Sequence, residues 1–321
     1  MKFGIVGTGM IAKMMLPEFA RCDKFEVHAV CSRKEETGRA LAEAFSIPKV
    51  YTELADMLAD EEIEIVYVAT PNHMHYQQAK AALEAGKHVI CEKPFTAYLA
   101  EAEELIVLAK EKHLLLYEAI TTAHHPAYQY IKDRLPAIGE IKVAMGVFCQ
   151  FSSRYPALME GKIAPVFMPE YKGGALMDIN LYNIHFLVGL FGKPEQVHYF
   201  PNCHTNGIDT SGVLILKYPG FVCQCVGAKD SAAENRVEIA GDKGSILVTP
   251  AASTCSDVVV KVRGSETEQA HWPENPWYYE VQDLGRCFET MDYEGCYRHL
   301  EATRNVVAVL EEGRKSANLC F

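Results

Sequence analysis

The chain has 321 residues, of which 49% are hydrophobic and 23% are charged, proportions that are ordinary for a soluble globular protein. The formal net charge of -11 at pH 7 and the lack of any basic block argue against a nucleic-acid partner held through its phosphates. The length predicts two domains, and no apolar run approaches the roughly 18 residues that cross a membrane, so we expect a soluble, cytoplasmic protein.

Residues 1–120 alternate predicted strands with predicted helices. The first residues have the basic start and apolar stretch of a signal peptide, but glycines interrupt them, which favours a strand and a turn. One predicted helix, residues 72–85, ends at Gly86, and another follows Pro94. The predicted strands cover residues 2–6, 25–31, 63–69, 88–91 and 114–117. This alternation predicts an α/β domain, a doubly wound parallel sheet with helices on both faces.

The first predicted strand ends in the motif G-x-G-x-x-A, which runs from Gly7 to Ala12. Gly7 allows a tight turn, Gly9 lets the backbone approach a pyrophosphate, and Ala12 permits close packing of the next helix. The amides and dipole of that helix then face the anion. An ordinary glycine turn would have the same letters, but its place between a strand and a helix favours dinucleotide binding.

The second predicted strand ends without the acid that would bind a ribose 2′-hydroxyl group. The sequence there continues as Ser32, Arg33 and Lys34. Ser32 can form a hydrogen bond to a phosphate, and Arg33 can stack on adenine and neutralise the additional charge. This favours NADP over NAD as the cofactor, although Arg33 and Lys34 would also suit a solvated helix start.

After residue 120 the pattern changes. Residues 152–172 are rich in proline and tyrosine and predict a long loop, and residues 174–190 predict one long helix. Strands are predicted over residues 196–201, 212–218, 221–226, 237–240, 245–248 and 258–262, and closing helices over residues 277–289 and 297–314. This spacing predicts an α+β domain with a mostly antiparallel sheet.

Polar residues follow one face of the predicted helix over residues 174–190. Asp178, Tyr182 and His185 recur at positions i, i+4 and i+7. A polar stripe on an apolar helix favours a functional site, and a satisfied core network is the alternative. Lys93, at the end of the fourth predicted strand, would by itself be interpreted as a surface lysine.

Three motifs together resemble one known family. They are the run from Ala69 to His75, ATPNHMH; the later GKHVICEKP, which ends at Pro94; and GGALMD, which ends at Asp178. With them the whole chain resembles the glucose-fructose oxidoreductase / inositol dehydrogenase (Gfo/Idh/MocA) family, and most of all its dimeric dihydrodiol dehydrogenase-like branch. The resemblance implies a Rossmann domain over residues 1–120 and a substrate-binding and dimerisation domain with an open-faced sheet over residues 121–321.

The resemblance also implies roles for single residues. Lys93 is expected at the carboxyl edge of the sheet beside the nicotinamide, with a cis bond to Pro94. Tyr182 is expected to exchange the proton, and Asp178 and His185 to bind and orient the substrate. A nearby cation lowers the pKa of a phenol, and Lys93 is the candidate cation. The expected cofactor contacts are Gly7, Thr8, Gly9, Met10, Ile11, Ser32, Arg33, Thr70, Asn72, His75, Glu92 and Lys93, and no metal ligand is expected.

Three positions depart from the family pattern. Asn180 replaces the glycine that usually follows Asp-Ile, and His185 stands where other members carry Asp, Asn or Gln. Residues 121–125 read TTAHH, where related enzymes often have an arginine or a bulky aromatic residue beside the nicotinamide. The substrate preference therefore does not carry over.

These features predict an NADP-dependent oxidoreductase that transfers a hydride between the nicotinamide and a carbinol carbon of a sugar, polyol or related diol. The first alternative is a non-catalytic, dinucleotide-sensing regulator, against which Lys93 and Tyr182 argue. The second is a metal enzyme, and its candidate ligands are His73, His75, His124, His125, Cys223 and Cys225. A single C-x-C pair is a weak metal signal, and the eleven scattered cysteines are interpreted as reduced, buried thiols.

Overall fold

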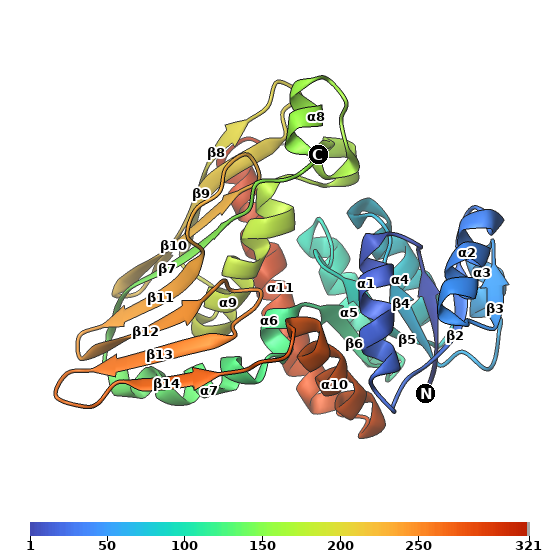
Figure 1. The fold of residues 1–321 in the computed structure, drawn as a ribbon, viewed down its shortest axis with the longest axis horizontal. Helices are drawn as coiled ribbons and strands as arrows, with labels where there is room; N and C mark the ends of the chain where they lie inside the picture. Colours follow the sequence, from blue (N-terminus) through green and yellow to red (C-terminus); the bar gives the residue numbers. More distant parts are fainter. Residues whose placement is uncertain (320–321) are drawn as a thin grey trace. The chain divides into compact units, whose positions relative to one another are not determined.

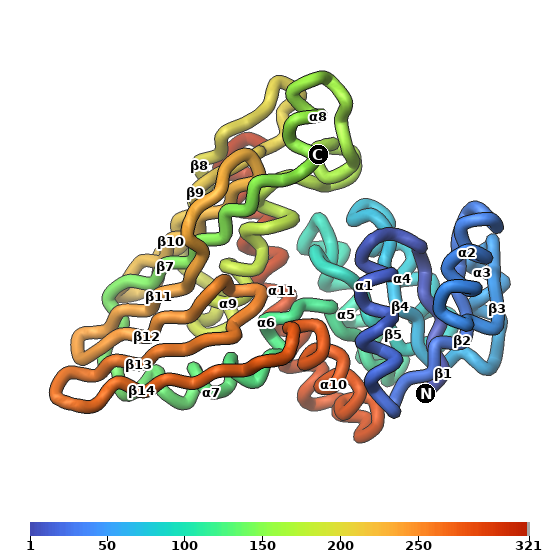
Figure 2. Tube along the Cα trace, viewed as in Figure 1, coloured from blue at the N-terminus to red at the C-terminus, as the bar shows by residue number. Residues whose placement is uncertain are grey.

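The computed structural model describes residues 1–319, which form two compact units (Figures 1 and 2). Unit 1 combines Met1–Ala119 with Glu280–Arg304, and unit 2 combines Ile120–Tyr279 with the chain from Asn305 onward. Residues 280–304 fall in the part of the sequence predicted as the second domain, yet they pack with the first unit. The domain limits of 1–120 and 121–321 stay a proposal.

Unit 1 is built on a six-stranded parallel sheet with the order β3-β2-β1-β4-β5-β6. Its strands are β1 Lys2–Val6, β2 Glu26–Cys31, β3 Lys49–Tyr51, β4 Ile65–Val68, β5 His88–Glu92 and β6 Leu116–Ala119. Its first helices are α1 Met10–Ala20, α2 Glu35–Phe45, α3 Leu54–Leu58, α4 His75–Glu84 and α5 Leu99–Glu111. The predicted Rossmann-type sheet is confirmed, and only the short, half-buried β3 was not predicted. The strand order reverses at β1 and β4, where such sheets open a crevice for a ligand.

The C-terminal segment completes the core of unit 1. It contains most of α10 (Pro276–Glu289) and the first half of α11 (Tyr293–Ser316). The Phe288 ring of α10 lies with its centroid 5.9 Å from those of Phe25 and His88 and 5.7 Å from that of Tyr117. On α11, the Cys296 thiol donates a hydrogen bond to the Leu116 carbonyl oxygen at 3.2 Å. The sheet of unit 1 is therefore covered in part by residues nearly 200 positions later in the chain.

Unit 2 holds an eight-stranded sheet with the order β14-β13-β12-β11-β7-β10-β9-β8. Every neighbouring pair is antiparallel except β7 and β10, so the predicted mostly antiparallel sheet is confirmed. Its strands are β7 Ile141–Cys149, β8 Gln196–Cys203, β9 Asp209–Tyr218, β10 Phe221–Ala228, β11 Arg236–Gly241, β12 Gly244–Thr249, β13 Asp257–Val262 and β14 Glu268–His271. Two strands were not predicted. Gly146 interrupts the pattern of β7, and β14 is a polar edge strand.

The helices of unit 2 differ from the prediction at one important place. The predicted single helix is a π-helix, Leu176–Asn180, followed by α9, Leu181–Phe191. The predicted long loop contains the short helix α8, Tyr155–Met159. The unit also has α6 Thr121–His124 and α7 Pro126–Arg134. Single π-turns are rare and occur often at functional sites.

By length and composition, the stretch Pro169–Phe191 would suffice to cross a membrane, because an 18-residue window in it reaches a mean hydropathy of 1.2. This stretch differs from the sequence prediction that no apolar run is long enough to cross a membrane. However, 72% of that window is buried inside the protein, so we interpret it as a core helix.

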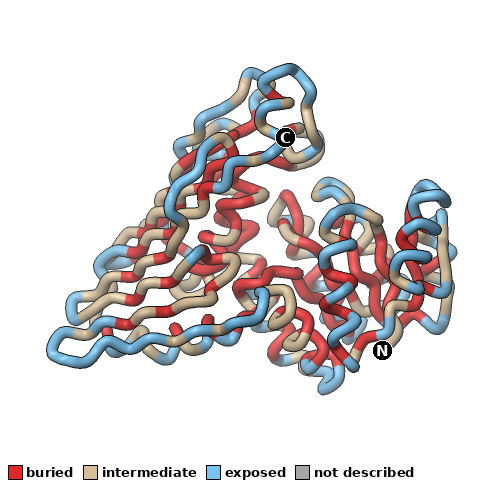
Figure 3. Tube along the Cα trace, in the orientation of Figure 1, coloured by how far each residue is buried: buried red, intermediate tan, exposed pale blue. Residues whose placement is uncertain are grey.

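One face of the sheet of unit 2 carries the core, and the other is open. Buried and less buried residues alternate along most of β10 and, from Gly212 onward, along β9 (Figure 3). The core face packs against the π-helix, α9 and the end of α11, which contributes Val306, Val309 and Leu310. The open-faced sheet predicted from the family resemblance is therefore present.

Two glycines in the sheet allow the π-helix and α9 to approach closely. A Cβ atom on Gly227 would lie 2.5 Å from Cβ of Asn180, and one on Gly146 would lie 2.8 Å from Oδ1 of Asn183. The Asn180 amide donates to the Cys225 carbonyl oxygen at 3.0 Å. The asparagine that departs from the family pattern thus fills the space above a glycine of β10 and bonds to the same strand.

The change Gly227→Ala should lower the free energy of unfolding by about 1–3 kcal/mol, the usual effect of overpacking a tight contact. Urea unfolding of both proteins measures the difference. Gln224→Ala is the matched control, since Gln224 lies on the same strand with its side chain on the open face, and should change stability by less than about 0.5 kcal/mol. Equal stability of Gly227→Ala and the wild type would contradict this close contact.

Candidate functional site

The glycine turn of unit 1 has the geometry that the sequence predicted. Gly7 has a φ of +110°, and a Cβ atom there would lie 2.5 Å from the Ala69 carbonyl oxygen, so only glycine fits. Around Gly9, by contrast, a Cβ atom would meet no atom within 4 Å. Helix α1 begins directly afterwards at Met10, and Gly9 has no side chain to cap it. The backbone amides of the first turn are therefore open to an anion.

A cavity of about 620 Å³ lies along this turn and the carboxyl ends of β1, β2 and β4. Of the predicted cofactor residues, those that line it are Gly7, Thr8, Gly9, Ile11, Ser32, Arg33 and Thr70. The other lining residues include Lys34, Thr37, Thr52, Glu53, Leu54, Pro71 and Gln78. The cavity thus joins an anion-binding turn at one end to two cations, Arg33 and Lys34, near the other.

The hydroxyl groups of Ser32 and Thr37 link the end of β2 to the first turn of α2. The Thr37 hydroxyl donates to the Lys34 carbonyl oxygen at 2.9 Å. The Ser32 and Thr37 hydroxyl oxygens lie 2.7 Å apart, so Ser32 donates to Thr37 and keeps its lone pairs for a further donor. Sequence reasoning found Ser32 and missed Thr37, because nothing in the spacing shows that the first turn of α2 faces the cavity.

Five predicted cofactor residues lie outside the described lining of this cavity. Met10 is 65% exposed, and Asn72 lies in a short 3-10 helix, Asn72–Met74. His75 and Glu92 are buried, and Lys93 is half-buried. The expected contacts of these residues with a cofactor stay predictions.

The turn that carries Lys93 is held by buried side chains. The Lys93–Pro94 bond is cis, as the resemblance implied. The two ring nitrogens of His75 lie 2.8 Å from the carbonyl oxygens of Pro94 and Thr70, so His75 joins this turn to the loop after β4. The Phe95 amide donates to the Glu118 carboxylate at 3.0 Å. Any role of His75 in cofactor binding would therefore act through the loops that it connects.

Unit 2 brings a second set of polar residues together at the π-helix. Asp178 lies in the π-helix, and Tyr182 and His185 lie one turn apart on α9. Asp178 forms an ion pair with Lys229, which follows β10 and is only 8% exposed. His185 is buried, while Asp178 and Tyr182 are partly exposed. The Tyr182 ring packs edge-on against Phe148 of β7, with centroids 5.8 Å apart.

A buried carboxylate fixes where the π-helix begins. Asp209 of β9 accepts hydrogen bonds from the Leu176 amide and from the Tyr199 hydroxyl, each at 2.7 Å. Gly174, with a φ of +98°, leaves no room for a Cβ atom beside the Asp209 carboxylate. The GGALMD motif is thus explained locally: its second glycine lets the chain turn against Asp209, which anchors the helix that carries Asp178.

Comparisons with known proteins match both halves of the chain. Residues 1–120 match the family model described as oxidoreductase family, NAD-binding Rossmann fold, and residues 128–247 match the GFO/IDH/MocA C-terminal domain. The chain belongs to the Gfo/Idh/MocA oxidoreductase family. The resemblance seen in the sequence motifs is therefore confirmed.

Known relatives of this Gfo/Idh/MocA chain match it over nearly their full length. The chain is 31% identical to scyllo-inositol 2-dehydrogenase (NADP(+)) of Bacillus subtilis, covering 100% of this chain and 98% of the relative. It is 30% identical to trans-1,2-dihydrobenzene-1,2-diol dehydrogenase of Mus musculus, with the same coverage. Among solved structures, a levoglucosan dehydrogenase in complex with NADH and levoglucosan has the same fold, with a TM-score of 0.85 at 20% identity over 99% of this chain and 97% of the other.

The residues that distinguish this Gfo/Idh/MocA chain, TTAHH, are held within unit 2. The hydroxyl groups of Thr121 and Thr122 donate to the carbonyl oxygens of Ser253 and Ala252 at 2.8 and 2.9 Å. The buried His125 accepts from the Ala127 amide at 3.2 Å and begins helix α7, and burial lowers its pKa to about 4. These contacts account for the two threonines and His125 as structural residues.

The cysteine pair is a poor metal ligand. Cys223 and Cys225 are fully buried on β10, and burial raises the pKa of the Cys223 thiol to about 12. Both thiols lie in the hydrophobic core of unit 2, and among the described residues neither joins a group of three metal-ligating side chains. The observation weighs against a metal site at this cysteine pair.

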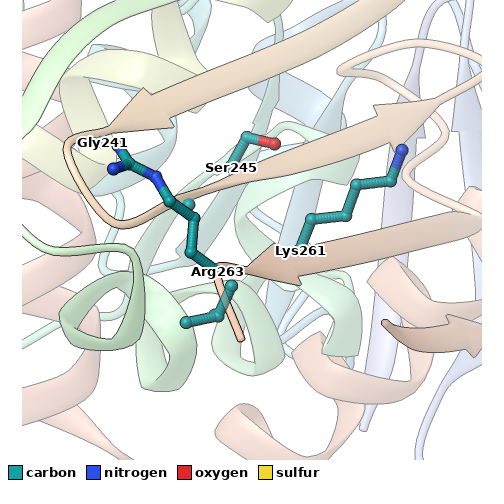
Figure 4. Close-up of a pocket in the computed structure, with 6 residues that line it drawn as sticks. Gly241, Ser245, Lys261 and Arg263 are labelled. Carbon is teal, nitrogen blue, oxygen red and sulfur yellow. The ribbon is translucent and has the colours of Figure 1, made fainter. Parts of the chain in front are cut away.

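A second, shallower cavity of about 320 Å³ lies at the turn between β11 and β12. Figure 4 shows two cations beside it, Lys261 and Arg263. The Arg263 guanidinium donates to the Asp242 carbonyl oxygen and lies toward Gly241, while the Lys261 ammonium extends away from it (Figure 4). The two cations do not converge on one point, so this cavity lacks the arrangement of an anion site.

Proposed function

We propose that the protein is an NADP-dependent oxidoreductase that transfers a hydride between the nicotinamide and a carbinol carbon of a sugar, polyol or related diol. The observation that carries this proposal is the cavity of unit 1, which has a glycine turn and an open helix N-terminus at one end and Arg33 and Lys34 near the other. The names of the bacterial inositol dehydrogenase and the mouse diol dehydrogenase support the same chemistry.

The residues of the cavity fit a dinucleotide phosphate. The open space at Gly9 admits a pyrophosphate against the first turn of α1. The cations Arg33 and Lys34 suit a phosphate on the adenosine ribose, and the Ser32 hydroxyl can turn its proton from Thr37 toward that phosphate. The lining includes one acid, Glu53, which stands after β3 rather than at the end of β2, where NAD-binding sheets carry theirs.

In this proposal, Tyr182 is the group that exchanges a proton with the reacting hydroxyl group. The bound nicotinamide supplies the hydride acceptor for alcohol oxidation and the hydride donor for carbonyl reduction. In oxidation the Tyr182 oxygen takes the hydroxyl proton as the carbonyl forms, and in reduction it returns that proton to the oxygen. Lys93 stabilises the negative charge on the oxygen atoms of substrate and tyrosine.

The substrate is oriented by Asp178 and His185 in this proposal. The Asp178 carboxylate, held by Lys229, can accept hydrogen bonds from substrate hydroxyl groups adjacent to the reacting carbon. A partly exposed carboxylate paired with a buried ammonium suits a neutral, hydroxyl-rich molecule.

We also propose a cytoplasmic protein that forms a homodimer or a larger homo-oligomer. The open face of the sheet in unit 2 carries exposed apolar residues, including Val143 and Phe200, which are 37% and 66% exposed. Apolar surface of this kind is a common interface in oligomers.

The proposal is tested by screening NADPH oxidation and NADP reduction against a panel of sugars, polyols and diols. Turnover of at least one member with NADP(H) is the expected result. The absence of turnover across the panel, together with NADPH binding by the same preparation, would favour the dinucleotide-sensing alternative.

NADPH should bind more tightly than NADH, and Arg33→Ala should weaken NADPH binding about 10- to 100-fold, since a hydrogen bond to a charged group contributes about 1.5–3 kcal/mol. Fluorescence titration of both cofactors measures this. NADH binding should change little in the variant. Arg39→Ala is the control, because Arg39 lies on α2, shortly after Arg33 in the chain, and pairs with Glu35 at 2.9 Å. Equal affinities for the two cofactors in the wild type would contradict the assignment.

A further inference from the structure

Three carboxyl side chains from different elements gather in the core of unit 1. Glu92 ends β5, Glu118 lies on β6, and Glu280 lies on α10, and they are 6%, 4% and 2% exposed. The charges of Glu92 and Glu118 act on Glu280. Three adjacent carboxylates cannot all be ionised in a buried site, so the cluster retains at least one proton.

Glu118 is the member of the cluster with two donors directed at it. One oxygen accepts from the Phe95 amide at 3.0 Å, and the other accepts from the Thr303 hydroxyl at 2.9 Å. The two hydrogen bonds hold both oxygens of the Glu118 side chain in place. Through them, Glu118 connects the turn that carries Lys93 to helix α11.

Glu92 also accepts hydrogen bonds on both of its carboxyl oxygens. The Tyr67 hydroxyl donates to one oxygen, and the Lys93 amide donates to the other at 3.3 Å. Burial raises the pKa of Glu92 to about 7, although the bond from Tyr67 and the charge of Lys93 oppose that shift. Glu92 therefore changes its protonation near neutral pH.

Glu280 is the member of the cluster whose pKa is not lowered by a hydrogen bond. Burial raises the pKa of Glu280 well above its ordinary value, and the charges of Glu92 and Glu118 raise it further, with no hydrogen bond to offset them. Glu280 is thus the member of the cluster that takes up a proton most readily.

The other ionisable groups around the cluster do not supply a compensating charge at Glu280. Burial raises the pKa values of Tyr67 and Cys91 well above their ordinary range, and burial lowers the pKa of His75. These shifts all favour the neutral forms of the three groups. The charge of Lys93 acts on Glu92.

We propose that Glu118 is a positioning residue that fixes the turn carrying Lys93 through the Phe95 amide, and that the buried Glu280 carries the proton of this carboxyl cluster. The proposal rests on the proposed function where it concerns turnover, since it assumes that Lys93 takes part in the reaction. Its statement about Glu280 is independent of any activity.

The two residues should respond in opposite ways to the same substitution. Glu118→Met removes the acceptor of the Phe95 amide, so kcat should fall by about tenfold or more, the scale expected when a catalytic group is displaced. The substrate KM and the NADPH dissociation constant should stay near the wild-type values. Glu280→Met replaces an acid without a hydrogen bond by an apolar side chain of similar length, so kcat should match the wild type. Glu118→Gln should restore most of the turnover, because its amide can accept from Phe95 and donate to Thr303.

The pH dependence of stability tests Glu280 directly. A carboxyl group whose pKa is raised on folding binds more protons in the native state than in the unfolded state at pH values between the two pKa values. Its contribution to stability is therefore lost as the pH rises above 4.5, the ordinary pKa of a glutamate side chain. The midpoint of urea unfolding of the wild type should fall between about pH 5 and pH 8, and this fall should be smaller in Glu280→Met.

Three results would overturn the proposal: an unchanged kcat in Glu118→Met, an equal loss of kcat in Glu280→Met, or an unchanged pH dependence of stability in Glu280→Met. If Glu118→Met does not fold, Thr303→Val gives a milder variant, in which a smaller loss confined to kcat is expected and no loss counts against the proposal.

A readout independent of turnover separates this inference from the proposed function. The rate at which acetic anhydride modifies Lys93, followed by peptide mass spectrometry, should change in Glu118→Met and match the wild type in Glu280→Met. If the wild type shows no NADP-linked turnover but this difference is found, the proposed function fails and the inference stands. Equal modification rates in all three proteins would overturn the role of Glu118.

Discussion

Replacing Tyr182 by phenylalanine should lower turnover by about 10²–10⁴-fold, the usual effect of removing a general acid or base. Only a hydroxyl group is lost, and the ring can keep its edge-on contact with Phe148, so the fold should be unchanged. NADPH should bind as in the wild type, since the cavity described for it lies in unit 1. Steady-state kinetics and cofactor titration on the same preparation measure both quantities.

Tyr130→Phe is the matched control for this substitution. Tyr130 also belongs to unit 2, and its hydroxyl donates to Glu268 at 3.3 Å on the exposed side of α7. Turnover of the control should be close to that of the wild type. Near-normal turnover in Tyr182→Phe would remove Tyr182 from the mechanism, whatever the control shows.

The change Lys93→Met should abolish most of the turnover while leaving the packing of the turn nearly unchanged, because methionine keeps much of the apolar stem of lysine. A cation favours the ionised form of a phenol, so its loss raises the pKa of the phenol above the value in the wild type. The rise of the oxidation rate with pH should therefore move to higher pH in the variant. Rates measured from about pH 6 to about pH 11 would show it.

Lys87→Met provides the comparison for Lys93. Lys87 directly precedes β5 and bonds to the Asp60 carbonyl oxygen at 2.9 Å, at the opposite end of the strand that precedes Lys93. An active Lys93→Met protein with an unshifted pH profile, indistinguishable from Lys87→Met, would mean that Lys93 is a surface lysine at the end of a strand.

The parts of the site that depend on local geometry could be predicted from the sequence. Gly7 was predicted because the tight turn between a strand and a helix leaves room for glycine alone, and Gly9 because a pyrophosphate needs the space beside it. Arg33 followed from the missing acid at a fixed distance along the chain. The motifs at Lys93 and Asp178 were found through the family resemblance, and the structure gives the local reason for one of them in the contact of Gly174 with Asp209.

The parts that depend on long-range packing could not be predicted. Lys229 stands in the sequence GAKDS, which has the composition of an exposed turn, and only the fold pairs it with Asp178, 51 positions earlier. Glu118 and Glu280 resemble any other acids of a strand and a helix, and their burial depends on α10 and α11 packing onto the first sheet. Strand β7 was missed because Gly146 weakens its pattern, although that glycine is what admits Asn183.

Helices α10 and α11 are each divided between the two units, and this constrains how the protein can fold during synthesis. During synthesis the first 119 residues leave the ribosome long before Phe288 and Cys296, the residues that cover Phe25, His88 and Tyr117. Part of the apolar surface of the first sheet therefore stays exposed to solvent until residues 280–304 have been translated. For the same reason, a fragment ending near Ala119 would lack the helical segments that cover its sheet. To exchange the cofactor-binding unit between relatives, residues 1–119 and 280–304 would have to be transferred together.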